Sequence, residues 1–188
     1  MTASAAPAPT STQYTNEKAF KDAVLNGTNT YRKQHNATAL TWNDTLAEYA
    51  EGWSDKCQFK HSEGPYGENL ASGYSNVTSG MDAWGHEREE YDFGKMEFSK
   101  KTGHFTQLVW KETTSVGCSR TECNGRDDGG APGFYVVCEY HPAGNVIGRF
   151  KENVQERDEG PKSGGGVEIS WHFLWIATFG VGGWCCLF

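Results

Sequence analysis

The residue best placed to do acid–base or metal chemistry beside a buried surface is His104, within the stretch GHFTQLVW at 103–110. Read as a helix, this stretch puts Phe105, Leu108 and Val109 on one face, at the i, i+3, i+4 spacing of buried residues. His104 then lies in the first turn beside a glycine that permits close backbone approach, and its imidazole can point into a cleft. The same residues also suit an ordinary core helix that contains a histidine without a chemical role.

Two further patterns approach catalytic motifs without completing them. The run HEREE at 86–90 starts like a zinc-protease helix, but Glu90 stands where the second histidine ligand is required. We interpret it as a solvated helix face from which only Glu87 turns inward. Ser62 adjoins His61, but sequence neighbours in a strand rarely face each other, and no Gly-x-Ser-x-Gly elbow is present. The residues therefore do not predict an enzyme, and no organic cofactor is expected.

The composition favours one acidic domain with tails. The chain has 188 residues, of which 37% are hydrophobic, enough for a core. The formal net charge of −7 argues against a nucleic-acid surface, because phosphate binding requires a basic patch. Residues 1–13 are rich in Ala, Pro, Ser and Thr and are predicted to be disordered. They lack the basic and apolar regions of a signal peptide and are interpreted as the start of a mature chain.

Cysteines and glycosylation triplets favour an extracellular protein. Four of the six cysteines lie inside the predicted domain and allow three disulfide connectivities, among which the sequence does not choose. Free buried thiols of a cytosolic protein are the alternative. The Asn-x-Thr triplets, each a weak signal alone, favour a glycoprotein. They begin at Asn26, Asn36, Asn43 and Asn76.

Hydrophobic periodicity predicts three helices ahead of the histidine stretch. The first runs from Asn16 to His35. The second begins after a cap at Asn43 or Asp44, because either side chain can accept hydrogen bonds from first-turn amides. The third spans residues 79–91 and starts with a capping box, Ser-x-x-Asp, at 79–82. The residues expected in the core of the second helix are Leu46, Tyr49, Ala50 and Trp53.

Alternating patterns predict strands at 57–61, 115–122 and 134–141. Gly and Pro make residues 62–67 a turn, and residues 124–133 form a glycine-rich hairpin loop. Residues 92–102 form a loop between the third helix and the histidine stretch. These elements must bring any site residues together, because the candidate residues are far apart in the sequence.

Four stretches, in order, resemble one known family. GHFTQLVW is similar to the signature of the CAP superfamily, which includes cysteine-rich secretory proteins, antigen 5 allergens and plant pathogenesis-related type-one proteins. LTWNDTLAEYA at 40–50, HSEGPYGENLA at 61–71 and CEYHPAGN at 138–145 match at the appropriate distances. The resemblance covers about residues 14–154 and is nearest to the fungal sterol-binding members. It implies an α+β fold, a three-layer α-β-α sandwich with a small antiparallel sheet, and disulfides Cys57–Cys123 and Cys118–Cys138.

The resemblance also assigns a cleft tetrad to His61, Glu68, Glu87 and His104. Two imidazoles and two carboxylates that converge can bind Zn²⁺ through nitrogen or a hydrated Mg²⁺ through oxygen. They can equally form two His–Glu hydrogen-bonded pairs without a metal. If imidazole nitrogens are the ligands, metal affinity falls as they are protonated below about pH 6.

An aromatic run at 91–98, YDFGKMEF, is the second candidate site. The aromatic side chains could simply anchor the loop to the core. The resemblance to the sterol-binding members implies instead a loop that lifts, with Gly94 as hinge, to open an apolar slot for a flat ligand. Burial of about 300 Å² at about 25 cal/mol per Å² gives about 7–8 kcal/mol before ordering costs. The slot residues expected are Tyr91, Phe93, Met96 and Phe98.

The sequence after the domain divides into a charged, Gly-rich linker at 155–168 and an apolar tail at 169–188. Twenty residues at about 1.5 Å per residue span about 30 Å, the thickness of a bilayer core. The tail is thus a membrane anchor, the removable part of a lipid-anchor signal, or an extension without function. Its glycines and its Cys185-Cys186 pair favour the last interpretation.

Together these features predict a secreted, monomeric lipid carrier. It binds sterols or other small apolar lipids and exports or sequesters them, and it contacts membranes during ligand pickup or through its tail. An extracellular protease or hydrolase that uses the tetrad is one alternative. A defence or virulence module that acts through its surface is another.

Overall fold

The computed structural model describes residues 10–124 and 130–158, and the structural statements below concern these residues. The predicted tail at 169–188, most of the 155–168 linker, residues 1–9 and the centre of the hairpin loop at 124–133 lie outside the described residues. Residues 155–158 are described. The amide of Asp158 donates to the carbonyl of Gln34 at 2.7 Å, so this part of the predicted linker contacts the end of the first long helix.

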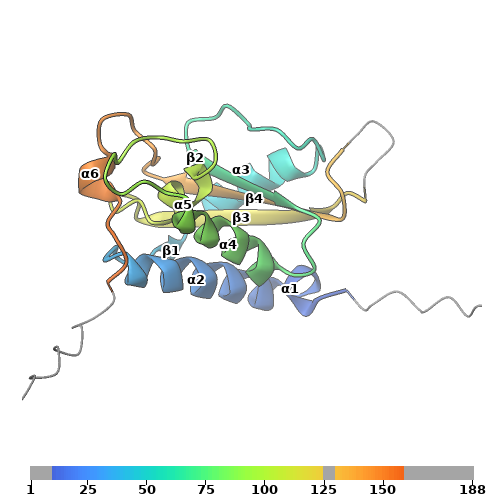
Figure 1. Cartoon of the computed structure of the whole chain (residues 1–188). Coiled ribbons are helices and arrows are strands. Elements are labelled where there is room, and N and C mark those ends of the chain that lie inside the picture. Colours follow the sequence, from blue (N-terminus) through green and yellow to red (C-terminus); the bar gives the residue numbers. More distant parts are fainter. Residues whose placement is uncertain (1–9, 125–129, 159–188) are drawn as a thin grey trace, which may run out of the picture. The chain divides into compact units, whose positions relative to one another are not determined.

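A four-stranded sheet with the order β1-β3-β4-β2 forms the centre of the domain (Figure 1). β3 (Ser115–Glu122) and β4 (Phe134–His141) form the predicted antiparallel hairpin, with the predicted ends. β2 (Gly67–Ser72) pairs antiparallel with the other side of β4. β1 (Thr41–Trp42) pairs parallel with β3. β1 and β2 were not predicted, because two residues and a Gly-Glu-Asn start carry little strand signal.

Helices cover both faces of the sheet, which confirms the expected three-layer α-β-α sandwich (Figure 1). α2 (Glu17–Gln34), α4 (Val77–His86) and α5 (Gly103–Leu108) share one core with Val136, Cys138 and Tyr140 of β4. The intervening residues of β4, Tyr135 and Val137, belong to a second core with Ala50 of α3 (Asp44–Ser54). Because successive side chains of a strand point to opposite faces, β4 contributes to the core on each side of the sheet.

Several elements are tied in place by specific side chains. The side chain of Asn16 caps α2, accepting from the amide of Ala19 at 2.9 Å, and His35 follows its last residue, as predicted. Asn43 caps α3 by accepting from Leu46 at 3.2 Å. Gly117 lets α3 lie directly on β3, because a Cβ there would come within 2.3 Å of the Ala47 amide nitrogen. A short α6 (Phe150–Asn153) follows the sheet.

Three details of the predicted helices were wrong. The third helix starts at Val77, because Asn76 caps α4 by accepting from Ser79 at 2.8 Å, and it continues as a 3₁₀ turn, η1 (Glu87–Glu89). Tyr49 is 36% exposed and packs on Tyr66, so it is not a core residue of α3. A short α1 (Thr12–Thr15) begins inside the segment predicted to be disordered. The side-chain amide of Gln13 ties it to α4 by donating to the hydroxyl of Thr78.

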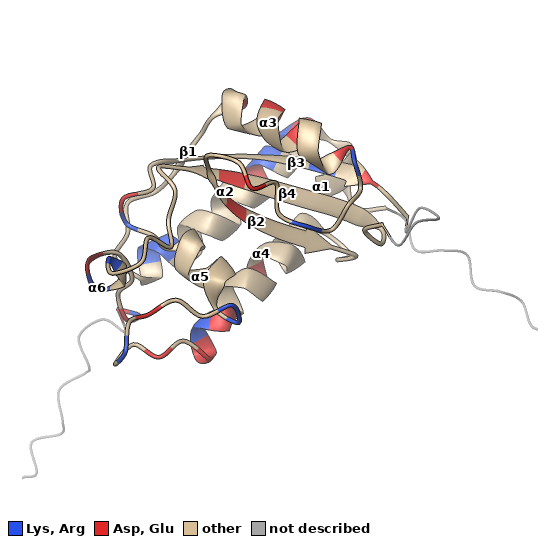
Figure 2. Cartoon of the chain, turned by 90° about the horizontal axis from the view of Figure 1, so that it is seen from above, with Lys and Arg blue, Asp and Glu red and all other residues tan. Residues whose placement is uncertain are grey.

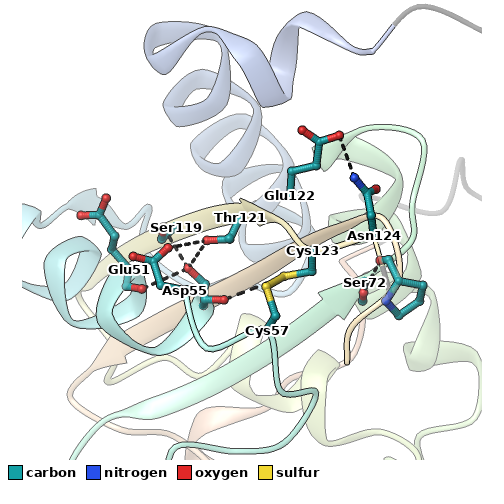
Figure 3. The surroundings of a disulfide bond; sticks show 11 residues. Glu51, Asp55, Cys57, Ser72, Ser119, Thr121, Glu122, Cys123 and Asn124 are labelled. Atoms are coloured by element: carbon teal, nitrogen blue, oxygen red, sulfur yellow. Dashed lines mark hydrogen bonds between the residues drawn. A yellow bond between two sulfur atoms is a disulfide. The ribbon is translucent and has the colours of Figure 1, made fainter. Parts of the chain in front are cut away.

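The predicted strand at 57–61 is absent, and these residues form an irregular loop. Cys57 has a φ of 54°, in the left-handed region that a strand residue does not adopt. Its disulfide to Cys123 joins this loop to the end of β3 (Figure 3). A hydroxyl cluster beside it links the end of α3 to β3, with Thr121 Oγ1 donating to Asp55 at 2.9 Å.

Both disulfides expected from the resemblance are present. Cys118 and Cys138 are directly opposed in the β3–β4 register, and their bridge lies in the core on the α2 side of the sheet. Cys57–Cys123 lies in the core on the α3 side. Each bridge stabilises a domain of this size by roughly 2–4 kcal/mol, chiefly by restricting the unfolded chain.

Candidate functional site

His61 and Glu68 form the first of two His–Glu pairs. His61 Nδ1 lies 2.6 Å from Glu68 Oε1, and the Ser62 amide donates to both oxygens of that carboxylate, at 3.0 and 3.2 Å. The hydrogen bond to Glu68 raises the pKa of His61 above its ordinary value, against the effect of its partial burial. Burial alone would raise the pKa of Glu68, but hydrogen bonds from His61, Ser62 and a neighbouring carboxyl together lower it.

His104 and Glu87 form the second pair, at the start of α5. His104 Nδ1 lies 2.6 Å from Glu87 Oε1. The other oxygen, Oε2, accepts from the amides of His104 and Phe105, both at 3.0 Å. Glu87 therefore caps α5 where the helix has free amides and no capping side chain of its own. The ring of buried Trp84 is stacked behind that of His104, with the ring centres 6.0 Å apart.

Sequence reasoning missed a third carboxyl group, that of Glu139. It is directly opposite Glu68 on the neighbouring strand, and Figure 2 shows that the sheet carries acidic residues. Glu139 is fully buried, and among the described residues no donor reaches either of its oxygens. Burial, and then the adjacent Glu68, raise the pKa of Glu139 to about 9. Glu139 is thus a neutral acid at pH 7, with a proton that it can donate to Glu68.

The pairs leave only part of the tetrad available to a metal. Both carboxylates use their oxygens on an imidazole and on backbone amides. The Nε2 atom of each imidazole remains, and a carboxylate on Nδ1 is the usual second partner of a metal-binding histidine. Across residues 10–124 and 130–158, no three His, Cys, Asp or Glu side chains are arranged to hold a metal ion. Each His–Glu pair thus leaves one imidazole nitrogen as its potential metal ligand.

Metal binding by the tetrad stays a prediction, with a defined pH dependence. A protonated imidazole cannot bind Zn²⁺, and the pKa of His61 is raised, so affinity should already decline as the pH falls through values above 6.5. We expect calorimetric titration with Zn²⁺ to give at least ~10-fold weaker binding at pH 5.5 than at pH 8. His104→Ala should bind weakly at both values. Equal affinity at the two pH values would contradict imidazole ligation.

The structure separates the four loop residues into anchors and exposed contacts. Tyr91 is buried, and Phe93 packs on the core, where its ring is stacked parallel to that of buried His35. Met96, with a φ of 52°, also packs on the core. Phe98 is 46% exposed. The anchoring and the ligand-lining interpretations therefore apply to different residues. The left-handed residue of the loop is Met96 and not the expected hinge, Gly94.

Two cavities meet at Phe98. The larger, about 710 Å³, is lined by residues 94–98 and by Ile147, Gly148, Phe150 and Lys151. The smaller, about 370 Å³, contains His61, Glu68 and Gln107. Phe98 and Ile147 line both. Gly103 makes room for the aromatic ring, because a Cβ there would lie 3.3 Å from Phe98. The two cavities thus share Phe98 and Ile147, and the smaller one also contains the ionisable pair His61 and Glu68.

The glycosylation triplets differ in their structural surroundings. Asn26 is exposed on α2, and Asn36 is exposed just after it, with a φ of 54°. Asn43 and Asn76 cap α3 and α4 through their side-chain oxygens. Glycosylation at the four positions stays a prediction. In the part of the chain that the structure describes, no helix has both the length and the apolar character needed to span a membrane.

Comparison with known sequences gives one consistent family. Residues 25–140 match the family described as CAP, the cysteine-rich secretory protein family. Protein PRY2 of Saccharomyces cerevisiae is 47% identical over 140 residues, which are 72% of this chain and 41% of that protein. Secreted protein RBT4 of Candida albicans is 40% identical over 69% of this chain and 36% of its own length. The chain thus spans less than half the length of these fungal relatives.

A plant relative supports the same family, and solved structures support the same fold. Pathogenesis-related protein 1A1 of Solanum lycopersicum is 32% identical, over 73% of this chain and 79% of its own length. The crystal structure of NaASP2 with Zn²⁺ is similar at a TM-score of 0.60, with 22% identity over 82% of this chain and 90% of that one. Schistosoma mansoni venom allergen-like protein 4 gives a TM-score of 0.56 at 23% identity, over 72% of this chain and 92% of that one. At these identities the structures support the fold alone.

Proposed function

This chain belongs to the CAP family, and from that premise we propose that it is a secreted carrier that binds sterols and related small apolar lipids and exports or sequesters them. The observation that carries the proposal is the cavity of about 710 Å³ beside Phe98. Its volume lies in the range of about 300–1,000 Å³ that small-molecule sites occupy. Met96, Phe98, Ile147 and Phe150 give it apolar walls.

The loop over the cavity is held by few long-range contacts. The amides of Gly94, Lys95 and Met96 all donate to Asp92, at 2.9–3.0 Å. Those of Lys101 and Thr102 donate to Ser99. These hydrogen bonds are local, so the loop can lift without breaking them, while Tyr91 and Phe93 keep its first part on the core. Such a loop can open the cavity to a flat ligand and close again over it.

The junction at Phe98 suits a ligand with one polar end. The apolar body of a sterol would fill the larger cavity, and its hydroxyl or ester end would point past Phe98 into the smaller one. There the Nε2 atom of His61 supplies a hydrogen-bonding group, because only Nδ1 is engaged by Glu68. A hydroxyl that kept a partner on binding would avoid the cost of burial without a hydrogen bond.

Two observations support a secreted protein. The part of the chain that the structure describes contains two disulfides, and disulfides persist mainly in oxidising compartments. The relatives RBT4 and PRY1 of Candida albicans are named as secreted proteins. A hydrolase is less well supported, because the hydroxyl of Ser62 accepts from the Gly64 amide and His61 Nδ1 is engaged by Glu68. An activated nucleophile needs a base in hydrogen-bond contact.

Equilibrium binding of radiolabelled ergosterol or cholesteryl acetate tests the proposal. Phe98→Ser should bind at least ~10-fold more weakly than wild type, because burial of one aromatic side chain contributes about 1.5–3 kcal/mol. The matched control is Phe59→Ser, which removes a phenyl ring that is 55% exposed and lines neither cavity. It should bind like wild type. Failure of the wild-type chain to bind either ligand would overturn the proposal, as would equal binding by Phe98→Ser.

A further inference from the structure

The loop between β4 and α6 presents an unusual pair of exposed side chains. Val146 is 42% exposed and Ile147 77% exposed. Large hydrophobic side chains with this much exposure are few among the described residues, and Phe98 is another. Phe98 and Ile147 line the same cavities, and Val146 directly precedes Ile147 in the chain. Figure 1 shows α6 and the loop that precedes α5 at the same end of the sheet.

The hydrogen bonds and backbone conformation of the loop account for the exposure of Val146 and Ile147. Asn145 fixes its base, because its side chain accepts from Thr106 at 2.6 Å and donates to the Gly103 carbonyl at 2.9 Å. The Arg149 amide donates to the Val146 carbonyl at 3.0 Å, which closes a turn that starts at Val146 and has Ile147 and Gly148 at its tip. Gly148, with a φ of 84°, permits that turn. A turn anchored on α5 therefore holds two aliphatic side chains in solvent.

Charged residues around this tip indicate its partner. Lys95 and Lys151 line the same cavity as Ile147, with Glu97 as the acidic residue there; the exposed Lys95 ammonium also lies 3.8 Å from Asp92. The whole chain, by contrast, carries a formal net charge of −7. An apolar tip flanked by lysines is suited to the interface of a bilayer, where aliphatic groups enter the headgroup boundary and lysines meet anionic lipid.

We propose that Phe98, Val146 and Ile147, flanked by Lys95 and Lys151, form a surface that docks on anionic phospholipid bilayers, so that a sterol passes directly between the bilayer and the cavity. The inference rests on the proposed function, because it assigns the source of the same ligand. Direct transfer avoids moving a poorly soluble ligand through water. The cavity mouth opens at the docked surface, and lifting of the loop at 94–98 takes place there.

The test compares transfer of a fluorescent sterol from vesicles with equilibrium binding of a soluble sterol ester, for the full chain. Val146→Glu places a charge beside the tip without altering a residue that lines either cavity. Tyr74→Glu is the matched control, because Tyr74 is 40% exposed. It follows Ser72, the last residue of β2, which pairs with the start of β4, whereas His141 ends that strand. Both variants keep the tail at 169–188, so any contribution of the tail is common to them.

From vesicles of phosphatidylcholine and phosphatidylserine, Val146→Glu should transfer sterol about tenfold more slowly than wild type, and Tyr74→Glu within about twofold of it. Both should bind the soluble ester like wild type. Wild-type transfer should be slower from phosphatidylcholine alone, and equal rates would overturn the assignment of the lysines. Unchanged transfer by Val146→Glu overturns the docking surface and leaves the carrier function intact. Loss of ester binding by this variant overturns the surface by placing Val146 in the cavity, whereas absence of ester binding by wild type refutes the carrier itself.

Discussion

Replacement of Arg32 by methionine is expected to lower the free energy of unfolding by about 3–5 kcal/mol, because several buried carbonyl groups would lose their hydrogen-bond donor. Arg32 is fully buried, and its burial lowers the pKa of the guanidinium to about 10. Its three nitrogens donate to four carbonyl oxygens at 2.7–3.0 Å. Methionine fills similar volume but donates nothing, so these buried acceptors would lose their partner. Urea unfolding with the disulfides intact measures the change.

The same substitution should disturb the candidate site, because two of the four carbonyls belong to Leu108 and Trp110, at the end of α5. Arg32 thus fixes the helix that carries His104. Arg32→Lys should give a smaller loss, since a single ammonium group reaches fewer acceptors. Lys33→Met, an exposed neighbour on α2, serves as the control and should change stability by less than about 0.5 kcal/mol. Equal stability of Arg32→Met and Lys33→Met would refute the argument.

Many of the helices and strands could be predicted, because local sequence preferences and tertiary packing favour the same structure in these segments. Asn16 both starts and caps α2, and the alternation in β4 matches two cores, one on each face. The short partners β1 and β2 could not be predicted, because they are strands only through pairing with β3 and β4. The loop after α3 was misread for a related reason. Its alternating pattern is local, but the disulfide of Cys57 imposes a different backbone.

The residues of the candidate site were harder to predict from local sequence than the helices and strands. His61, Glu68, Glu87 and His104 come from four separate segments, so only the family resemblance could group them, and only coordinates could show that they form two pairs. The burial of Arg32 carried no signal in the sequence, since charged residues are almost never fully buried, and that of Glu139 carried one that was overlooked. The hydrophobic alternation along β4 continues through Glu139, and this placed a carboxyl group at a core position. That misfit between residue type and position was the available clue.

Glu139→Gln is expected to stabilise the protein at pH 8 by about 2–4 kcal/mol relative to wild type, and to leave stability unchanged near pH 4. In the folded protein the pKa of Glu139 is about 9, whereas an unfolded chain has the ordinary value of 4.5. The folded state therefore holds a proton that the unfolded state releases. Wild-type stability should thus fall as the pH rises from about 4.5 towards 9, by up to about 1.4 kcal/mol per pH unit.

Glutamine removes this loss of stability at high pH, because its amide is neutral at every pH. The amide can also donate to Glu68, as the protonated acid can. Thermal unfolding of both proteins between pH 4 and pH 9 measures the difference. Glu122→Gln, an exposed acid on neighbouring β3, should show no such pH dependence. A stability difference that stayed constant across the pH range would mean that Glu139 is ionised in the fold. The buried pair would then carry two negative charges with no cation beside Glu139. Desolvation and repulsion both oppose that arrangement, which is why we assign one shared proton to Glu68 and Glu139.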